Sequence, residues 1–382
     1  MKVTSSVLVL LAGLMLQVDA ATVEVSTCDD LETAAAATAT EDTTATFTET
    51  GYTTLDCATT NDEGESEIRS FTVENNMLTL EAPDASTMRF TAIRFNLTNS
   101  GELLVTHPDV VFQSSLSYNA VEMDGGFMYL GEGSKARFLG DLTVTAYQTR
   151  SATNGADFAL DSLDGGCLSN NGYFRVEGYT TFTSCDNSGG GESSPGRGGA
   201  VFNSETGSIL FTEGVRMEDT ALTDNEGGPG AGIYNLGKVN IKGNSVFYDL
   251  VADTEEDYGG AIYNGEGAKF TFRSNAGAAF IDNDASGGSA VYNLGEFRFS
   301  GPALFTLNAN TVIENRSPGY LKLSSQSSFW LIDTDEDLGA VVSYSGATLE
   351  FPDDLVFLSL EGDTTECDYI NVETDDGFDC FS

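Results

Sequence analysis

Residues 259–264 read GGAIYN, and this six-residue template recurs along the chain at intervals of 29 to 33 residues. The other copies are GGCLSN (165–170), GGAVFN (198–203), GAGIYN (230–235) and GSAVYN (288–293), with a degenerate copy, GGFMYL, at 125–130. Two short runs of alternating hydrophobic and polar residues follow each of these glycine boxes, with no helical stretch between them. Each unit therefore holds three short strands separated by turns.

Strands this short cannot bury both of their faces alone, so the units must stack on one another. If each unit forms one coil of a solenoid, equivalent residues lie roughly 4.8 Å apart on successive coils, as they do on neighbouring strands of a parallel sheet. The sequence therefore predicts an all-β fold, a single parallel β-helix with three short strands per coil and capped ends.

Every glycine box except the degenerate copy ends in asparagine. Stacked asparagine amides can hydrogen-bond along the solenoid and satisfy the polar groups of a buried turn. The glycines at the start of the box permit a sharp corner with positive φ. We therefore predict a structural role for the asparagine column, which consists of Asn170, Asn203, Asn235, Asn264 and Asn293.

The GGAIYN box, the Phe-containing strands after it and a Phe-x-x-Asn element resemble the polymorphic outer membrane protein repeat, first recognised in chlamydial surface proteins. That repeat is found also in secreted right-handed β-helix proteins of the pectin-lyase-like superfamily. The resemblance covers about residues 125 to 310 and implies a right-handed coil. It also implies adhesion or an extracellular structural role, while the wider superfamily implies polysaccharide cleavage.

We expect one elongated domain rather than two. Residues 1–20 are expected to form a signal peptide, 21–70 a Thr-, Ala- and acid-rich cap or arm, 71–360 the β-helix, and 361–382 an acidic cap. The signal peptide is predicted from Lys2, the apolar run from Val7 to Leu16 and the small residues that end at Ala20. A secreted protein, extracellular or associated with a cell wall, follows from it. No later run is apolar enough over a sufficient length to predict a membrane span.

The chain of 382 residues carries 59 Asp and Glu against 17 Lys and Arg, a formal net charge of -42. This charge repels nucleic acid and anionic membranes, so neither is expected as a partner. With 40% hydrophobic residues, the chain is still able to build a core. We expect it to be a monomer.

Six cysteines in a secreted chain are disulfide candidates. Of about fifteen possible connectivities, pairing of nearest neighbours gives Cys28–Cys57, Cys167–Cys185 and Cys367–Cys380. The first and last of these pairs would fasten the two ends of an elongated fold. Zinc is not expected, because the sequence contains no Cys-x-x-Cys and His107 is its one histidine.

Basic residues gather in the second strand of successive units, where the alternation points them outward and stacking aligns them in one stripe. One interpretation is a cationic track for an anionic polysaccharide. The other is a solvated face whose cations offset the acidic surplus. Nine of the 17 basic residues belong to the stripe, namely the outer members Lys135, Arg137 and Lys322 and the candidate binding residues Arg175, Lys238, Lys242, Lys269, Arg273 and Arg298.

An aromatic column follows the aliphatic residue of each box, and it consists of Phe202, Tyr234, Tyr263 and Tyr292. If the aliphatic residues point into the core, the aromatic rings form an exposed ladder suited to stacking on sugar rings. The general tendency of aromatic residues to be buried favours the opposite orientation, with the rings inside and the aliphatic residues outside.

The sequence contains no recognisable catalytic constellation. His107 stands beside Asp109 in THPDV, and it would have to act with that residue as an acid–base pair or serve merely as a turn residue. Acidic runs such as 253–257 would suit calcium, but the sequence has no EF-hand loop or glycine-rich nonapeptide array, so no cofactor is expected. Two N-glycosylation sequons begin at Asn96 and Asn315.

The sequence thus predicts a secreted, non-enzymatic β-helix protein that acts as an extracellular surface, cell-wall or matrix component and binds anionic polysaccharide or mediates adhesion. A polysaccharide-active lyase, hydrolase or epimerase is the alternative, and the lack of a convergent His, Asp and Arg set argues against it. An ice-binding solenoid would need a flat Thr-x-Thr array at coil spacing, and TATAT-like segments are noted only near residue 38.

Overall fold

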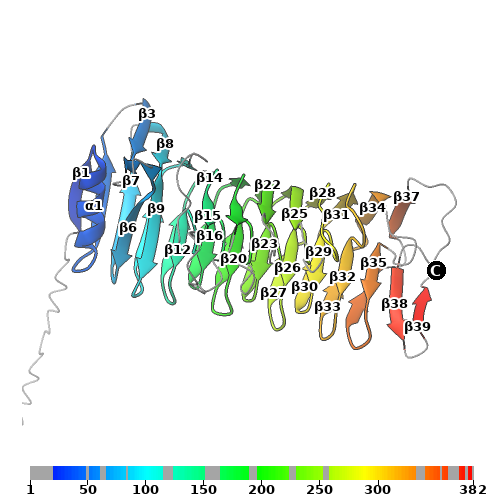
Figure 1. Ribbon diagram of the computed structural model, residues 1–382. Coiled ribbons are helices and arrows are strands. Elements are labelled where there is room, and N and C mark those ends of the chain that lie inside the picture. The colour runs from blue at the N-terminus through cyan, green and yellow to red at the C-terminus, as the bar shows by residue number, and fades with distance from the viewer. Residues whose placement is uncertain are drawn as a thin grey trace, which may run out of the picture.

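The protein is an elongated stack of coils, with the helix α1 (Cys28–Ala37) at one end and the strands β38 (Ile370–Thr374) and β39 (Gly377–Cys380) at the other (Figure 1). Three long sheets run through the stack, and their order gives three strands per coil. The predicted parallel β-helix is confirmed. The computed structural model describes residues 20–48, 51–60, 66–82, 85–114, 124–150, 164–188, 196–222, 229–252, 258–332, 340–352, 355–359, 370–374 and 377–380, so the predicted signal peptide lies almost wholly outside it.

Sheet 1 holds the glycine-box strands and their equivalents on the other coils. Neighbouring strands are parallel, except that β38 and β39 pair antiparallel at its end. Its other strands are β6 (Arg69–Glu74), β9 (Ile93–Thr98), β12 (Met128–Leu130), β16 (Leu168–Asn170), β20 (Val201–Asn203), β23 (Ile233–Asn235), β26 (Ile262–Asn264), β29 (Val291–Asn293), β32 (Ile313–Asn315) and β35 (Val341–Ser343).

Sheet 2 follows sheet 1 along each coil and carries the predicted basic stripe. All of its pairings between neighbouring strands are parallel. It consists of β1 (Ala21–Val25), β2 (Thr43–Phe47), β7 (Met77–Glu81), β10 (Glu102–Val105), β13 (Lys135–Phe138), β17 (Tyr173–Val176), β21 (Ser208–Phe211), β24 (Lys238–Ile241), β27 (Lys269–Phe272), β30 (Glu296–Phe299), β33 (Tyr320–Lys322) and β36 (Thr348–Glu350).

Sheet 3 completes each coil. Its main path consists of β3 (Gly51–Asp56), β8 (Ala85–Thr91), β11 (Asp109–Gln113), β14 (Asp141–Thr145), β18 (Thr180–Thr183), β22 (Val215–Leu222), β25 (Ser245–Ala252), β28 (Ala278–Ile281), β31 (Ala303–Thr306), β34 (Ser327–Ile332) and β37 (Val356–Ser359). Beside this path lie β15 (Gln148–Arg150) and β19 (Asp186–Ser188), and a separate antiparallel pair is formed by β4 (Thr59–Thr60) and β5 (Ser66–Glu67).

The first glycine of the box makes the corner that leads into sheet 1. In the fourth box Gly259 has φ +74°, and a Cβ added there would collide with the carbonyl oxygen of Ile262. The strand that follows alternates, with Ile262 and Asn264 fully buried and Tyr263 half-buried between them. The glycine therefore sets both the corner and the phase of the strand.

Stacked phenylalanines fill the interior of the C-terminal half. Phe247, Phe280, Phe305 and Phe329 lie on successive strands of sheet 3, with ring centroids 4.9, 5.0 and 4.6 Å apart. The three values match the strand spacing of about 4.8 Å, because in-register strands place identical side chains one above another. Each ring is fully buried, and together the rings form a continuous apolar column.

The Thr-, Ala- and acid-rich segment, expected as a cap or arm, contains the one helix among the described residues, which the alternation analysis did not anticipate. Thr27 caps the helix α1, and Asp30 completes a capping box by bonding back to the Thr27 backbone. Leu31, Ala34 and Ala35 are buried against the first coils. The helix contacts β1, β2 and β6, so it covers the end of the solenoid where those strands would otherwise be open.

Two of the three predicted disulfides are confirmed. Cys28 at the start of α1 is bonded to Cys57, and Cys167 in the glycine box at 165–170 is bonded to Cys185 after β18. The first ties the capping helix to the body of the solenoid. The third predicted pair involves Cys367, which lies outside the described residues.

On sheet 3, the residue that directly follows Glu218, Tyr248 or Ile281 adopts a left-handed backbone conformation and turns the chain. Asp219, Asp249 and Asp282 occupy equivalent places on successive coils with φ of 50°, 52° and 55°. An L-residue is strained in this conformation, and asparagine tolerates it better than most others. The three carboxylates also repel one another at strand spacing.

We expect Asp249→Asn to raise the free energy of unfolding by about 0.5–1 kcal/mol, because it removes a like charge and keeps a residue type that tolerates φ 52°. Chemical denaturation of the variant and the parent protein measures the difference. A variant no more stable than the parent would show that the three carboxylates do not destabilise this corner.

Candidate functional site

The asparagine column forms a buried hydrogen-bonded ladder. The Nδ2 of each asparagine donates to the Oδ1 of the next one along the stack, at 2.6 Å for the first step from Asn170 and 2.7–2.8 Å for the following ones. All of its members are fully buried. The side-chain oxygens of Asn235 and Asn293 also accept from the backbone NH groups of Gly237 and Gly295. The amides thus satisfy the turn between sheets 1 and 2.

The ladder continues to Asn315, which sequence analysis marked as a glycosylation site. The Asn315 side chain is fully buried, accepts from Asn293 at 2.8 Å, and donates to Ser343 Oγ and to the Thr348 carbonyl. A glycan cannot be attached to an amide enclosed in this way, so the sequon at Asn315 is not usable in the folded protein. The sequon at Asn96 lies half-buried on β9, and its glycosylation stays a prediction.

The aromatic column lies on the outer face of sheet 1, which corrects the orientation favoured from the sequence. The aliphatic neighbours Val201, Ile233, Ile262 and Val291 are fully buried in the core cluster, and the aromatic residues are not part of that cluster. Asn264 decides the phase, because a buried asparagine two residues after Ile262 requires Ile262 to point inward as well.

The rings of the aromatic column stack face to face. Tyr234 and Tyr263 have ring centroids 4.7 Å apart and nearly parallel planes, and Tyr263 and Tyr292 lie 5.3 Å apart. Phe202 and Tyr234 are additionally covered, with exposures of 5% and 8%. Both faces of each inner ring therefore pack against neighbouring rings. A sugar would meet ring edges and hydroxyl groups rather than open ring faces.

Arg197 closes the N-terminal part of this column. Its guanidinium lies over the rings of Phe202 and Tyr234, 4.7 and 5.5 Å from their centroids, and forms a bidentate pair with Asp164. Burial raises the pKa of Asp164 to about 6, against the opposing effect of the Arg197 charge. The pair fixes Arg197 against the aromatic rings rather than providing an open cationic site.

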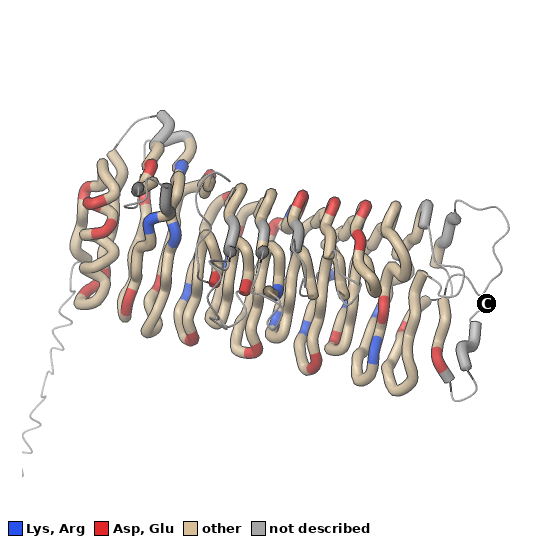
Figure 2. The backbone as a smooth tube through the Cα atoms, viewed as in Figure 1, with Lys and Arg blue, Asp and Glu red and all other residues tan. Residues whose placement is uncertain are grey.

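The basic stripe occupies the outer face of sheet 2, as two in-register columns and a third just beyond the strands. Lys238 pairs in register with Lys269, and Arg137 with Arg175. Lys242 and Arg273 directly follow β24 and β27. Figure 2 shows basic residues interspersed with acidic residues along the coils, and many of the acidic residues lie at the turns.

Most of the stripe is neutralised by glutamates of the same face. Glu296 pairs with Lys269 at 3.0 Å and with Arg298 at 2.6 Å, and Glu177 pairs with Arg137 and Arg175. Lys135 pairs with Glu102 and Lys322 with Glu350. Within the described ranges, Lys238, Lys242 and Arg273 form no ion pair, although Arg273 donates to Asn240 at 3.2 Å. The free positive charge is therefore concentrated on the coils of β24 and β27.

His107 is built into a turn. It is 4% exposed, and its Nδ1 lies 2.7 Å from the backbone carbonyl oxygen of Asp109 and 3.1 Å from the backbone nitrogen of the same residue. The Asp109 carboxylate instead accepts from Thr87 Oγ1 at 2.7 Å. The structure does not bring the two side chains together as an acid–base pair.

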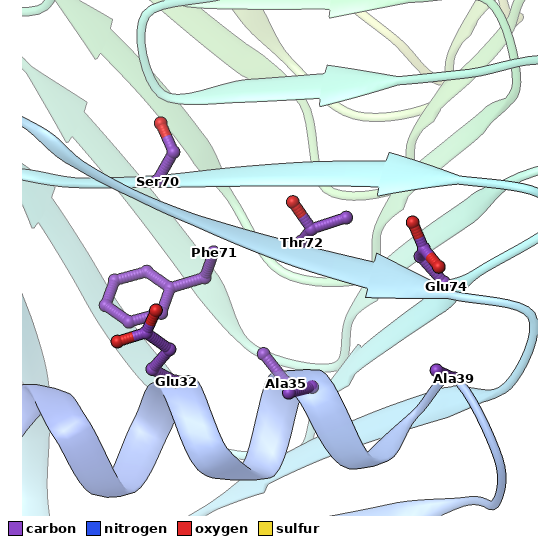
Figure 3. Close-up of a pocket in the computed structure, with 8 residues that line it drawn as sticks. Glu32, Ala35, Ala39, Ser70, Phe71, Thr72 and Glu74 are labelled. Atoms are coloured by element: carbon purple, nitrogen blue, oxygen red, sulfur yellow. The ribbon is translucent and has the colours of Figure 1, made fainter.

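A shallow pocket lies at the N-terminal end between α1 and β6 (Figure 3). Its volume is about 360 Å³, and short side chains form most of its wall. Glu32 and Glu74 are its two carboxylates, and Arg69 already binds Glu32. The lining residues are Glu32, Ala35, Ala36, Ala39, Ser70, Phe71, Thr72 and Glu74.

Sequence analysis missed an apolar patch on the outer face of sheet 3. Tyr248 and Trp330 stand in the same column three strands apart, and Leu307 and Val356 lie nearby. These are four of the five large hydrophobic residues that are exposed among those described, at 38–50%. Such gathering is typical of interaction surfaces. The alternation of sheet 3 could have predicted this patch, because Ile281 pairs with Tyr248 and both occupy the outward-facing column.

The same face holds a small threonine array nearer the N-terminus. Thr143 and Thr145 on β14 lie in register with Thr181 and Thr183 on β18. This places Thr-x-Thr at coil spacing, which the sequence analysis did not find. The next coil continues the two columns with Arg216 and Glu218, so the array ends after two coils.

No three His, Cys, Asp or Glu side chains come together as metal ligands in the part of the chain that the structure describes. The acidic runs 253–257, 333–337, 353–354 and 375–376 lie outside it. Within the same ranges, no helix has the length and apolar character needed to cross a membrane.

No protein-family model matches the chain, and no curated protein matches it. The resemblance to the polymorphic outer membrane protein repeat and to the pectin-lyase-like superfamily therefore stays a prediction drawn from the residues. The class that the structure itself defines is a capped parallel β-helix with an internal asparagine ladder.

Proposed function

We propose that the protein is a secreted, non-enzymatic surface, cell-wall or matrix component that binds an anionic polysaccharide along sheet 2. The observation that carries the proposal is the alignment of Lys238, Lys242 and Arg273, without ion pairs in the described ranges, on adjacent coils of a chain with net charge -42. The two disulfides support an extracellular location.

The geometry of sheet 2 suits a linear polyanion. Adjacent coils repeat at about 4.8 Å, so charges on β24 and β27 lie well within the Debye length of about 8 Å at physiological salt. Lys238 and Lys269 are exposed, and a ligand that approaches these coils meets the nearby cations before it meets the net negative charge of the chain. A row of sulfate or carboxylate groups can therefore meet several cations at once.

The quadruple change of Lys238, Lys242, Lys269 and Arg273 to Ser tests this site. We expect the parent protein to be retained on a heparin or alginate column at low salt and to elute as salt rises, because the attraction is electrostatic. The quadruple variant is expected to flow through. Its melting temperature is expected to stay nearly unchanged, because exposed charges contribute little to folding.

A control variant with the same net charge shows whether retention depends on where the cations lie or only on how many are removed. Changing Lys135, Arg137, Arg175 and Lys322 to Ser removes the same charge from cations that glutamates already neutralise, so this variant is expected to remain on the column. Glu296→Gln releases Lys269 and Arg298 and is expected to strengthen retention. If the parent is not retained, or if both quadruple variants behave alike, sheet 2 is only a solvated face.

A further inference from the structure

Four tyrosines form one continuous stack on the outer face of sheet 1. Tyr234, Tyr263 and Tyr292 lie on successive coils, and Tyr258 packs on Tyr292 with ring centroids 4.7 Å apart. Parallel strands in register hold the first three, since Tyr234 pairs with Tyr263 and Tyr263 with Tyr292. The backbone register therefore sets the spacing of these three rings, and the Tyr258 ring packs on Tyr292 at a tilt of 31°.

The stack is partly open to solvent. Tyr258, Tyr263 and Tyr292 are half-buried, while Tyr234 lies beneath Arg197. Burial raises the pKa of Tyr263 above its usual range, and the neighbouring tyrosines act in the same direction, so the phenol is protonated at neutral pH. The three half-buried tyrosines keep part of their surface in contact with solvent, where a small oxidant is present.

We infer that this tyrosine stack is a site of oxidative cross-linking, at which a one-electron oxidant joins tyrosines of successive coils as dityrosine. Each of two phenols gives one electron to the oxidant and one proton to solvent. The two phenoxyl radicals then form a carbon–carbon bond between ring positions ortho to the oxygens. Each ring regains aromaticity when its ortho hydrogen is lost as a proton and the oxygen takes one up. The pair thus loses two electrons and two protons, and two equivalents of oxidant are reduced.

The fixed stack favours coupling within one molecule over coupling between molecules. A radical on an isolated surface tyrosine must meet a second one by diffusion, whereas each ring in the stack already has a neighbour at 4.7–5.3 Å. Holding two reactants side by side in this way raises their effective concentration greatly. A link between Tyr234 and Tyr263 would join two coils covalently across the strand spacing.

Photo-oxidation with a ruthenium tris-bipyridyl complex and persulfate tests the inference on the full chain. The monomer is isolated under denaturing conditions, and dityrosine is measured by its fluorescence and by mass spectrometry of proteolytic peptides. We expect peptide pairs that are two hydrogens lighter than their sum and that join Tyr234 to Tyr263, Tyr263 to Tyr292, or Tyr258 to Tyr292.

Two double variants and an unfolded sample provide the controls. Tyr263→Phe with Tyr292→Phe leaves no adjacent tyrosine pair in the stack, so dityrosine in the monomer is expected to fall to the level of urea-unfolded protein. Tyr173→Phe with Tyr248→Phe removes tyrosines outside the stack and is expected to leave the yield unchanged. The inference is overturned if the parent monomer carries no such links, if the first variant matches the parent, or if dityrosine forms only between molecules.

Discussion

Replacing Phe280 by Ala is expected to lower the free energy of unfolding by about 3–5 kcal/mol, the largest effect of any single change considered for this protein. The Phe280 ring is fully buried between Phe247 and Phe305, at 4.9 and 5.0 Å, and it also meets Phe272 and Phe299 edge to face. Its removal leaves a cavity that in-register strands cannot close without moving whole coils.

Chemical denaturation followed by far-ultraviolet circular dichroism measures this loss. Leu139→Ala is the matched control, because Leu139 is 40% exposed and its truncation is expected to change the free energy of unfolding by only about 0.5 kcal/mol. A loss below about 1 kcal/mol for Phe280→Ala would mean that the phenylalanine column is not the continuous core described above.

Asn264→Ala is expected to cost about 1–3 kcal/mol. The substitution removes the acceptor of the Asn235 amide, at 2.7 Å, and the donor to Asn293 at 2.8 Å. Both partners stay buried, so each loses a hydrogen bond that water cannot replace. The upper part of the range applies if the neighbouring coils do not relax.

Thermal or chemical unfolding of Asn264→Ala is compared with that of Asn275→Ala, in which an exposed asparagine of a turn is lost. The control is expected to stay within about 0.5 kcal/mol of the parent. Equal behaviour of the two variants would show that the ladder contributes nothing beyond an ordinary turn.

The coil and its ladder could be predicted from the sequence because they repeat. The spacing of the boxes gives the length of a coil, and an asparagine at the same place in each box has a structural explanation only if the coils stack. The alternation after each box gave the outward direction of Lys238 and Lys269, and the structure places both on the exposed face.

Features that do not repeat could not be predicted in this way. The helix α1 depends on the capping box of Thr27 and Asp30 and on a local run of alanines, and a search for strand alternation overlooks both. The unit of Asn315 lacks the glycine box, so the sequence indicates only a sequon there, although Asn315 continues the ladder after Asn293.

The sequence alternation contains the orientation of the aromatic column, although general burial frequencies predict the opposite one. General burial frequencies favoured the rings inside, whereas the alternation from Asn264 back to Ile262 requires Tyr263 to point outward. Neutralisation of the basic stripe depends on which glutamate reaches which cation. Glu296 binds two cations at once, and only side-chain positions reveal this.

The affinity of the parent protein for a sulfated polysaccharide, measured by calorimetry across a series of salt concentrations, tests the proposed function most directly. We predict binding at low salt, with the logarithm of the affinity falling linearly as the logarithm of salt concentration rises. The slope of the variant that lacks Lys238, Lys242, Lys269 and Arg273 is expected to be smaller by about one for each lost contact. Absence of binding at low salt, or affinity that does not change with salt, would contradict the account.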